Sequence, residues 1–599
     1  MAEVGTERPA QRVLVVSDTS DAPARLAVEN THAAFDCARI GHDVFDLSAD
    51  APWPDLKNYS AVITATENLG LLAPEHVASL FSFVEAGGGV AAVYRAQPSK
   101  LDKLFGMISC NTPFSIRAAD SGGIRFPGQT LPAFEGIQLT SEGMIGHASL
   151  DQIPDRGVEV LATTWSGKPI AWALSVGRGR TAYWNSVFLS QKRARGLIIQ
   201  TLEVIQPLTL APVVNAGVVQ IDDFPAPLVG HLPGFVQEEF PELSPEAFYS
   251  DVWCPDMFGL AERHGLKYSC FCVFDYVELH ELEAAGIDPA DHRPAADAFE
   301  PIQRYRPPEM GLHGYNHQSL QLRDWPDITE MTDALGHAKE LWASFGCGAL
   351  PTSYVPPNNQ YDVAGIRALA GVFPSIKVIS GSFFGRTEDG ANREFGPEPW
   401  KPDLFCLPRT TCGYECTDET LFDSASQLAT LGVWTHFLHP DDLLDVPEPN
   451  TSPIGRRNPH RRPWRSRNGV QGLLDQAAAL FSSIARRFPW LTYRTTAETA
   501  DLVQEHLASD WTIGFGDKSV SIAGPEGGLI RLRVNRWGRR HMNGLSGCEV
   551  VYETVGRHHT AYILKMTAQE ARVTLSGTAW IADMAGRIKS SQPPMRKAS

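Results

Sequence analysis

The sequence lacks several features that would point to particular classes of protein. No apolar run approaches the roughly 18–20 residues that span a bilayer, and the start, MAEVGTERPAQR, lacks the apolar segment of a secretory signal. Basic residues are also few: 52 Lys and Arg stand against 69 Asp and Glu, giving a net charge of −17. This balance argues against a chain that mainly binds nucleic acid or an anionic membrane. We expect no membrane span, no nucleic-acid partner and a cytoplasmic location.

Cysteine is sparse as well, with 10 residues in a chain of 599. Without a signal sequence, these are expected to be reduced thiols rather than a disulfide framework. Two spacings resemble metal-binding pairs, Cys270 with Cys272 and Cys412 with Cys416. Neither has a partner pair at zinc-finger spacing, so buried structural cysteines are the favoured interpretation.

The first segment, residues 11–207, alternates short buried strands with amphipathic stretches, beginning with Val13–Val16. This alternation predicts a parallel α/β domain. The pattern resembles the class I glutamine-amidotransferase-like and flavodoxin-like folds. It lacks the Gly-x-Cys-x-Gly nucleophile turn of the former, since Cys110 lies in Ile-Ser-Cys-Asn-Thr. We therefore expect a non-catalytic domain.

The remaining chain divides further by its texture. Pro207 to Pro212 suggests a hinge, after which strands alternate with helices over residues 213–508, which favours a distorted (β/α) barrel. Residues 511–589 contain short alternating segments, predicting a small β-rich domain, and the polar residues 590–599 are expected to be disordered. The fold class is therefore α/β with three domains, because 599 residues exceed one core.

Acidic residues and histidines cluster at the predicted ends of three barrel strands. The strand Val218–Ile221 runs into Asp222 and Asp223, and an adjacent carboxylate pair needs a cation or hydrogen bonds to stay ionised. His313 and His317 are four positions apart, a spacing that puts both on one face of a helical turn, within reach of one cation. A third strand ends at His439, and alternation directs His436 to the opposite face. Barrel enzymes gather catalytic groups at such ends.

These segments resemble the polysaccharide-deacetylase family, that is, the carbohydrate esterase 4 group and relatives that share the chitooligosaccharide-deacetylase homology domain. Its motif Thr-Phe-Asp-Asp is similar to Gln220–Asp223, and Glu-Ile-Gly-x-His-x-x-x-His is similar to Glu309–His317. The final Leu-x-His motif is similar to Phe437–His439. The resemblance covers residues 213–505, about half of the chain.

This sequence departs from the family's pattern at two positions. Val355 stands where the family has an arginine that orients the catalytic aspartate, and no Asp-x-x-Asp-Trp motif is found. Arg409, at the end of a strand-like run, could hold Asp222 instead through a charge-assisted hydrogen bond, or it could be an ordinary surface arginine. With the preceding α/β domain, these departures look more like the divergent deacetylases of galactosamine-containing exopolysaccharide than like small chitin deacetylases.

The resemblance implies an enzyme that hydrolyses a carbon–nitrogen amide bond. Asp223, His313 and His317 would bind a divalent metal, most commonly Zn²⁺, and a metal-bound water would attack an N-acetyl group on an amino sugar or related carbohydrate. Asp222 would be the general base and His439 the general acid. Two alternatives stay open: a catalytically degenerate protein that binds carbohydrate or acts as a scaffold, and a hydrolase of a non-sugar amide.

The segment from Gly455 to Gly469 carries six arginines and follows the strand that ends at His439. Arginine forks bind phosphate or carboxylate, so an anionic substrate is one expectation, with Arg461 and Arg462 as contacts. The alternative is a solvated loop that balances local acidity. Tyr315 and Tyr354 are further candidates for substrate contacts, by stacking on a sugar ring.

Overall fold

The computed structural model describes residues 11–97, 99–107, 122–140, 157–225, 232, 234–276, 285–286, 299–447, 451–452, 455–516 and 518–577. The chain divides into two compact units, the first of residues 1–215, 425–432 and 506–599, and the second of residues 216–424 and 433–505. Cys110 and the expected tail at 590–599 lie outside the described residues. Among the described helices, none combines the length and apolarity that crossing a membrane requires.

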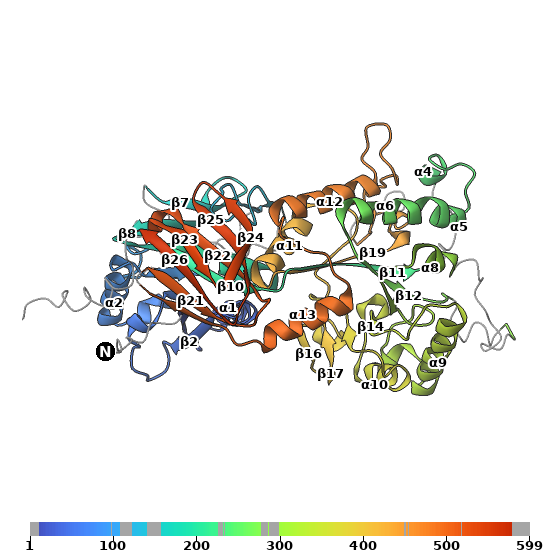
Figure 1. Cartoon of the computed structure of the whole chain (residues 1–599), viewed down its shortest axis with the longest axis horizontal. Coiled ribbons are helices and arrows are strands. Elements are labelled where there is room, and N and C mark those ends of the chain that lie inside the picture. The colour runs from blue at the N-terminus through green and yellow to red at the C-terminus, as the bar shows by residue number, and fades with distance from the viewer. Residues whose placement is uncertain are drawn as a thin grey trace, which may run out of the picture. The chain divides into compact units, whose positions relative to one another are not determined.

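The first unit contains a nine-stranded sheet (Figure 1). Its strands, in spatial order, are β2 (Gly41–Asp46), β1 (Arg12–Ser17), β3 (Ala61–Thr64), β4 (Gly89–Ala92), β9 (Gly179–Trp184), β8 (Pro169–Val176), β7 (Glu159–Thr164), β5 (Ile124–Arg125) and β6 (Gln138–Leu139). The first five are parallel, and their order corresponds to the 2-1-3-4-5 arrangement of flavodoxin-like folds. The expected parallel α/β pattern is therefore present, with an antiparallel extension from β8 onward.

Helices α1 (Arg25–Cys37), α2 (Pro74–Glu85) and α3 (Arg195–Ile205) accompany this sheet. Pro74 occupies the first turn of α2, where its missing N–H costs nothing, and Gly87, with φ of 118°, follows the end of the helix. Leu80 and Phe83 of α2 pack into a core with Leu14, Val62 and Val90 of the strands.

The same unit contains two four-stranded antiparallel sheets that share one apolar core. One consists of β10 (Leu208–Val213), β22 (Leu529–Asn535), β25 (His559–Met566) and β24 (Cys548–Val555); the other consists of β20 (Thr512–Phe515), β21 (Ser519–Ala523), β26 (Glu570–Gly577) and β23 (Arg540–Ser546). The β-rich C-terminal region is thus present. The predicted hinge at 207–212 is wrong, because most of this segment forms strand β10. As an edge strand, β10 pairs on one side only, so the missing N–H of Pro212 is tolerated.

Buried charges tie these sheets to α3, within the first unit. Glu203 of α3 pairs with Arg531 at 2.8 Å and with Arg533 at 3.4 Å, and all three side chains are largely buried. These contacts help to join the C-terminal strands and the N-terminal sheet in one compact unit. The sequence pattern had suggested two separate domains, 11–207 and 511–589.

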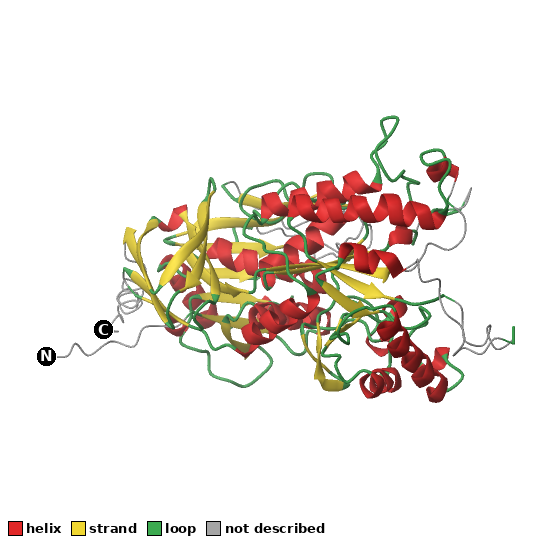
Figure 2. Cartoon of the chain, turned by 45° about the vertical axis from the view of Figure 1, so that its right-hand side comes forward, coloured by secondary structure: helices red, strands yellow, loops and turns green. Residues whose placement is uncertain are grey.

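The second unit contains a curled nine-stranded sheet with helices on both sides (Figure 2). Its spatial order is β16 (Gly396–Glu398), β17 (Lys401–Cys406), β15 (Val378–Ile379), β14 (Ser353–Tyr354), β13 (Glu309–Leu312), β12 (Tyr268–Cys272), β11 (Ala216–Phe224), β19 (Val433–Leu438) and β18 (Thr411–Cys412). All neighbouring strands are parallel except β16 with β17. The parallel strands therefore direct their carboxyl ends to one edge.

This sheet is an open half-barrel rather than the distorted (β/α) barrel expected from the sequence. In the described part, β16 and the two-residue β18 form its edges and do not pair with each other. The associated helices are α4 (Gly234–Gln237), α5 (Pro245–Phe248), α6 (Cys254–His264), α8 (Glu300–Tyr305), α9 (Ile328–Ser344), α10 (Val363–Val372), α11 (Asp418–Thr430), α12 (Leu473–Arg487) and α13 (Thr496–Ala508).

Candidate metal centre and active site

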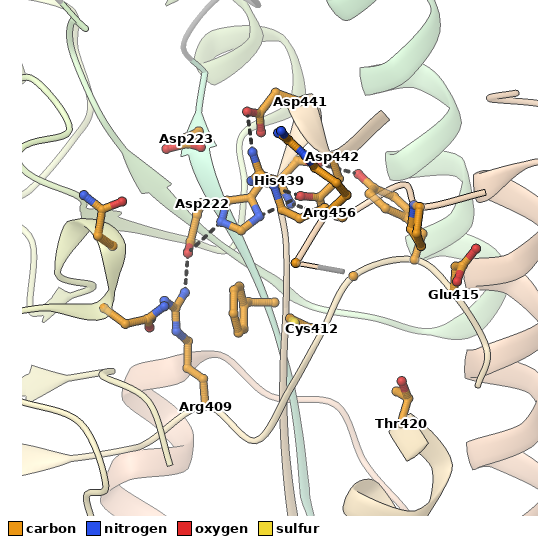
Figure 3. Close-up of a pocket in the computed structure, with 18 of the residues that line it drawn as sticks. Asp222, Asp223, Arg409, Cys412, Glu415, Thr420, His439, Asp441, Asp442 and Arg456 are labelled. Atoms are coloured by element: carbon orange, nitrogen blue, oxygen red, sulfur yellow. Dashed lines mark hydrogen bonds and ion pairs between the residues drawn. The ribbon is translucent and has the colours of Figure 1, made fainter. Parts of the chain in front are cut away.

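A cavity of about 790 Å³ lies at the carboxyl ends of the parallel strands of the second unit (Figure 3). Its walls come from the ends of β11, β18 and β19 and from the segments that follow β12, β13, β14, β17, β18 and β19. Both aspartates and all three histidines singled out in the sequence line it, namely Asp222, Asp223, His313, His317 and His439.

Asp222 and Asp223 reach the cavity together because β11 is irregular at its end. In a regular strand, consecutive side chains point to opposite faces. Here the register with β12 shifts between Ile221 and Phe224, and Asp223 has a φ of 56°. This bulge turns two adjacent carboxylates toward one site, a local feature that alternation alone does not predict.

His313 and His317 also converge through a loop, and the predicted helical turn is wrong. Residues 313–318 are irregular after β13, with positive φ at Gly314 (89°) and His317 (58°). Nδ1 of His313 lies 2.8 Å from the carbonyl oxygen of Val355, so this nitrogen carries the proton and Nε2 offers its lone pair. Val355, where the resemblance to the deacetylases led us to look for an arginine, thus supplies a backbone acceptor for His313.

Three ligand atoms face one another in this cluster. Oδ1 of Asp223 lies 3.4 Å from Nε2 of His313 and 3.4 Å from Nε2 of His317. In the described structure, neither Asp223 Oδ1 nor His313 Nε2 has a hydrogen-bond partner. Ligand atoms about 2.0–2.1 Å from a tetrahedral cation are separated by about 3.4 Å. The orphaned atoms and their spacing therefore fit a divalent metal such as Zn²⁺.

The electrostatics of the cluster favour the protonation states that a metal needs. Burial lowers the pKa of His317 to about 4, so its imidazole is neutral at pH 7. Burial alone would raise the pKa of Asp223, but the neighbouring imidazoles outweigh it and hold that pKa well below its usual value. A neutral imidazole and an ionised carboxylate are the metal-binding forms of these side chains.

Arg409, which also lines the cavity, holds Asp222. Nη1 of Arg409 donates to Oδ2 of Asp222, and Nη2 donates to Oδ1 of Asn359. The guanidinium also lies over the ring of Phe437, 3.8 Å from its centroid. Burial would raise the pKa of Asp222, but the charge of Arg409 overrides it and keeps the pKa below its ordinary value.

His439 approaches the same oxygen of Asp222, with its Nε2 3.6 Å from Oδ2. Its Nδ1 contacts Oδ1 of the buried Asp442 at 3.0 Å. Burial would lower the pKa of His439, but the charge and hydrogen bond of Asp442 raise it to about 9. His439 is therefore cationic at pH 7. As alternation predicted, His436 lies outside the cavity lining; its Nδ1 is 2.9 Å from Thr411 Oγ1.

The structure does not bring the four predicted substrate contacts to the cavity. Tyr315 and Tyr354 are buried and leave no face for a sugar ring. Arg461 is exposed and Arg462 donates to Glu415 at 2.6 Å; neither lines the cavity. The lining arginines of the loop are Arg456 and Arg457, and both pair with aspartates. The loop thus balances local acidity, which is the alternative considered above.

Sequence reasoning did not assign roles to several residues in the cavity, among them Tyr276, Asn359, Asp442 and Arg457. Burial, followed by the charge of Asp223, raises the pKa of Tyr276 far above its usual value, so its hydroxyl stays a donor. The expectation of buried structural cysteines is confirmed for Cys270 and Cys272 but is wrong for Cys412, which is exposed and lines the cavity. Asp442 had a visible signal, since it lies three positions after His439. The contacts of Asn359 and Arg457 depend on loop conformation.

Comparison with known proteins identifies a bacterial family described as "Uncharacterised protein conserved in bacteria (DUF2194)", which matches residues 124–555. No curated protein sequence matches significantly. Among solved structures, an exo-β-1,4-mannosidase from Opitutaceae bacterium strain TAV5 is 18% identical, covering 31% of this chain and 34% of its own, with a TM-score of 0.23.

Two further structures have similarly low scores. A β-galactosidase from Bacillus circulans sp. alkalophilus is 16% identical over 34% of each chain, with a TM-score of 0.24. A cytoplasmic protein from Salmonella typhimurium LT2 is 12% identical, covering 33% of this chain and 100% of its own, with a TM-score of 0.26. The matched region spans about a third of the two glycosidases. At these scores the similarities carry no argument about function.

Proposed function

The chain belongs to this DUF2194 family of bacterial proteins, and for it we propose a metal-dependent hydrolase of the polysaccharide-deacetylase type. Its reaction would remove an acyl group, most simply N-acetyl, from an amino sugar or a related carbohydrate. The single observation that carries the proposal is the cavity in which the Asp223, His313 and His317 cluster adjoins a restrained carboxylate and a cationic imidazole.

The metal-binding residues of the proposed enzyme are Asp223, His313 and His317. A divalent cation bound there would supply Lewis-acid polarisation of the acyl carbonyl and lower the pKa of a coordinated water. Val355 contributes through its carbonyl oxygen, which holds the His313 ring in the orientation that leaves Nε2 free.

Asp222 is the general base of the proposed reaction. Its Oδ2 is engaged by Arg409, whereas its Oδ1 has no hydrogen-bond partner in the described structure and is free to accept a proton from the attacking water. The water oxygen bonds to the acyl carbon, and the carbon–nitrogen bond breaks. Because Arg409 fixes the carboxylate, little reorganisation accompanies the proton transfer.

His439 is the general acid. It is protonated at pH 7 because Asp442 stabilises the imidazolium, and it lies next to Asp222 on the cavity wall. Its proton goes to the departing nitrogen, so the products are a carboxylate and a free amine. The base and the acid of the proposed reaction therefore lie in the same cavity, one for each of its two proton transfers.

Metal analysis and acetate release test the proposal together. Purified protein should retain about one equivalent of zinc, which His317→Ala should lose. Against a panel of N-acetylated sugars, Asp222→Asn should keep the metal and lose about 10²–10⁴ in kcat. His460→Gln is the matched control, because this exposed histidine lies outside the cavity lining. Metal-loaded protein that releases no acetate from any acetylated sugar would contradict the proposal.

A further inference from the structure

A second group of potential metal ligands lies in the same cavity. His439, Asp441 and Asp442 each offer one ligand atom, and these atoms lie within 4.8 Å of one another, as do those of the Asp223 cluster. Two groups of nitrogen and oxygen ligands facing one cavity are the arrangement of hydrolases that use two metal ions. By ligand chemistry alone, this cavity could hold two divalent cations.

The guanidinium of Arg457 lies in this second group. Its Nη2 is 2.8 Å from Asp441 Oδ2, and its Nη1 is 3.0 Å from Asp442 Oδ1. The same Asp442 oxygen lies 3.0 Å from Nδ1 of His439. A permanent positive charge therefore contacts both carboxylates, one of which also holds the imidazole.

The fold of the chain itself places Arg457. Its backbone N–H donates to Asp445 Oδ2 at 2.9 Å, and its Nε lies 3.4 Å from the same oxygen. The next residue, Asn458, is fully buried, and its side chain donates to the carbonyl of Leu443 at 3.0 Å. The arginine-rich loop is thus fastened to the turn after His439, independently of any substrate.

We propose that Arg457 is a positioning residue that acts as a built-in cation: it holds Asp442 against His439 and keeps a second metal ion out of the cavity. The role in cation exclusion stands on the geometry of this group alone. The catalytic consequence rests on the proposed function, in which His439 is the acid.

Arg457 suits this role because of its charge and because, unlike a metal ion, it leaves the His439 imidazole uncoordinated. Adjacent carboxylates such as Asp441 and Asp442 need a nearby cation to remain ionised together, and a guanidinium supplies that charge at any physiological pH. A metal ion in the same place would take the lone pair of the His439 imidazole. A coordinated imidazole is neutral, and its remaining N–H is a far weaker acid than that of an imidazolium, so it would donate a proton poorly to the leaving group. Arg457 therefore supplies the charge without consuming the acid.

Zinc binding in a background without the first cluster tests the proposal directly. We would remove that cluster with His313→Ala and His317→Ala, equilibrate the full chain with Zn²⁺ alone, and measure bound zinc by mass spectrometry after dialysis. The background should bind none. Adding Arg457→Met to this background should produce binding of one equivalent of zinc. Adding Asp441→Asn to that variant should abolish this binding. Arg457→Lys retains a cation and should bind none. Arg457→Gln repeats the measurement if the methionine variant does not fold.

The outcomes separate this proposal from the proposed function. If Arg457→Met and Arg457→Gln bind no zinc in the folded background, the cation role of Arg457 is overturned, whatever the wild type binds. If the wild type binds no zinc while Arg457→Met gains one equivalent in the background, the proposed function fails and the role of Arg457 stands. In the otherwise intact chain, Arg457→Met should raise the zinc content from one to two equivalents.

Discussion

Arg409 donates a hydrogen bond to Asp222, although the two residues are 187 positions apart in the chain. Both side chains are almost completely buried, at 1% exposure each. In the deacetylase family that the sequence resembles, an arginine is expected at the position of Val355, and here Arg409 approaches the carboxylate from a different strand end. A guanidinium can make the same charge-assisted hydrogen bond from either position.

Removing Arg409 should destabilise the protein strongly. Arg409→Met leaves the buried carboxylate of Asp222 without its partner, which should lower the free energy of unfolding by about 3–5 kcal/mol. The double variant with Asp222→Asn should recover most of the loss, since no buried charge is then left unpaired. Urea denaturation at pH 7 measures the free energy of unfolding of both variants.

Arg456→Met is the control. The side chain of Arg456 is 46% exposed in its pair with Asp445, so this variant should lower the free energy of unfolding by at most about 1 kcal/mol. Equal losses for Arg409→Met and Arg456→Met would be incompatible with this account.

Asn359 should matter for catalysis through Arg409. Asn359 and the preceding Asn358 both have positive φ, of 57° and 56°, and both line the cavity, but a hydrogen bond to Arg409 is described only for Asn359. Asn359→Ala frees the guanidinium to rotate, so kcat for deacetylation should fall by roughly tenfold or more, because small misplacements of catalytic groups are costly. Asn358→Ala is the matched control and should leave kcat much closer to the wild type. Steady-state kinetics on the best acetylated sugar would show the difference, and equal kcat losses would refute it.

The sequence was most informative about the residue types of the candidate site and about the order of the strands that carry them. Asp222, Asp223 and His439 follow strands whose parallel pairing could be predicted, and the carboxyl ends of such strands meet at one edge. The flavodoxin-like order of β2, β1, β3, β4 and β9 likewise follows from alternating strands and helices. These features rest on local periodicity, which a single sequence displays.

The other features of the candidate site depend on backbone geometry and on burial, which a single sequence does not display. Positive φ, as at Asp223 and His317, is uncommon for any residue other than glycine, so a single sequence does not show where the tertiary surroundings will impose it. Arg461 and Arg462 could not be distinguished from Arg456 and Arg457 by sequence, because which of them lines the cavity depends on how the loop is fastened to Asp445. Tyr354 was misjudged because an aromatic residue beside a motif is equally compatible with core packing.

Zinc should remain bound at lower pH than in a site of ordinary histidines. A ligating imidazole must lose its proton, and burial lowers the pKa of His317 to about 4 from 6.5. Between these two values an ordinary imidazole is mostly protonated, but His317 is mostly neutral and able to bind. Dialysis against zinc-free buffer should therefore leave the same zinc content at pH 5.5 as at pH 7.5, with loss only as the pH approaches 4. Release with a midpoint near 6.5 would show that protons compete with zinc at an unperturbed histidine.

The basic limb of the pH–rate profile should report His439. In the proposed reaction His439 is the acid and must be protonated, and Asp442 raises its pKa to about 9 against the effect of burial. Activity should hold from neutral pH up to about pH 9 and fall above it. Asp442→Asn removes both the charge and the ionic hydrogen bond, leaving burial to push the pKa of His439 down toward 6.5 or lower. The basic limb should then move down by about two pH units or more, and activity at pH 8 should fall by roughly a hundredfold, at a tenfold loss per pH unit above the pKa.

Glu415→Gln is the matched control, since Glu415 lines the same cavity but pairs with Arg462 rather than His439. Its basic limb should stay near pH 9, and a limb that stays near pH 9 in Asp442→Asn would show that His439 is not the acid.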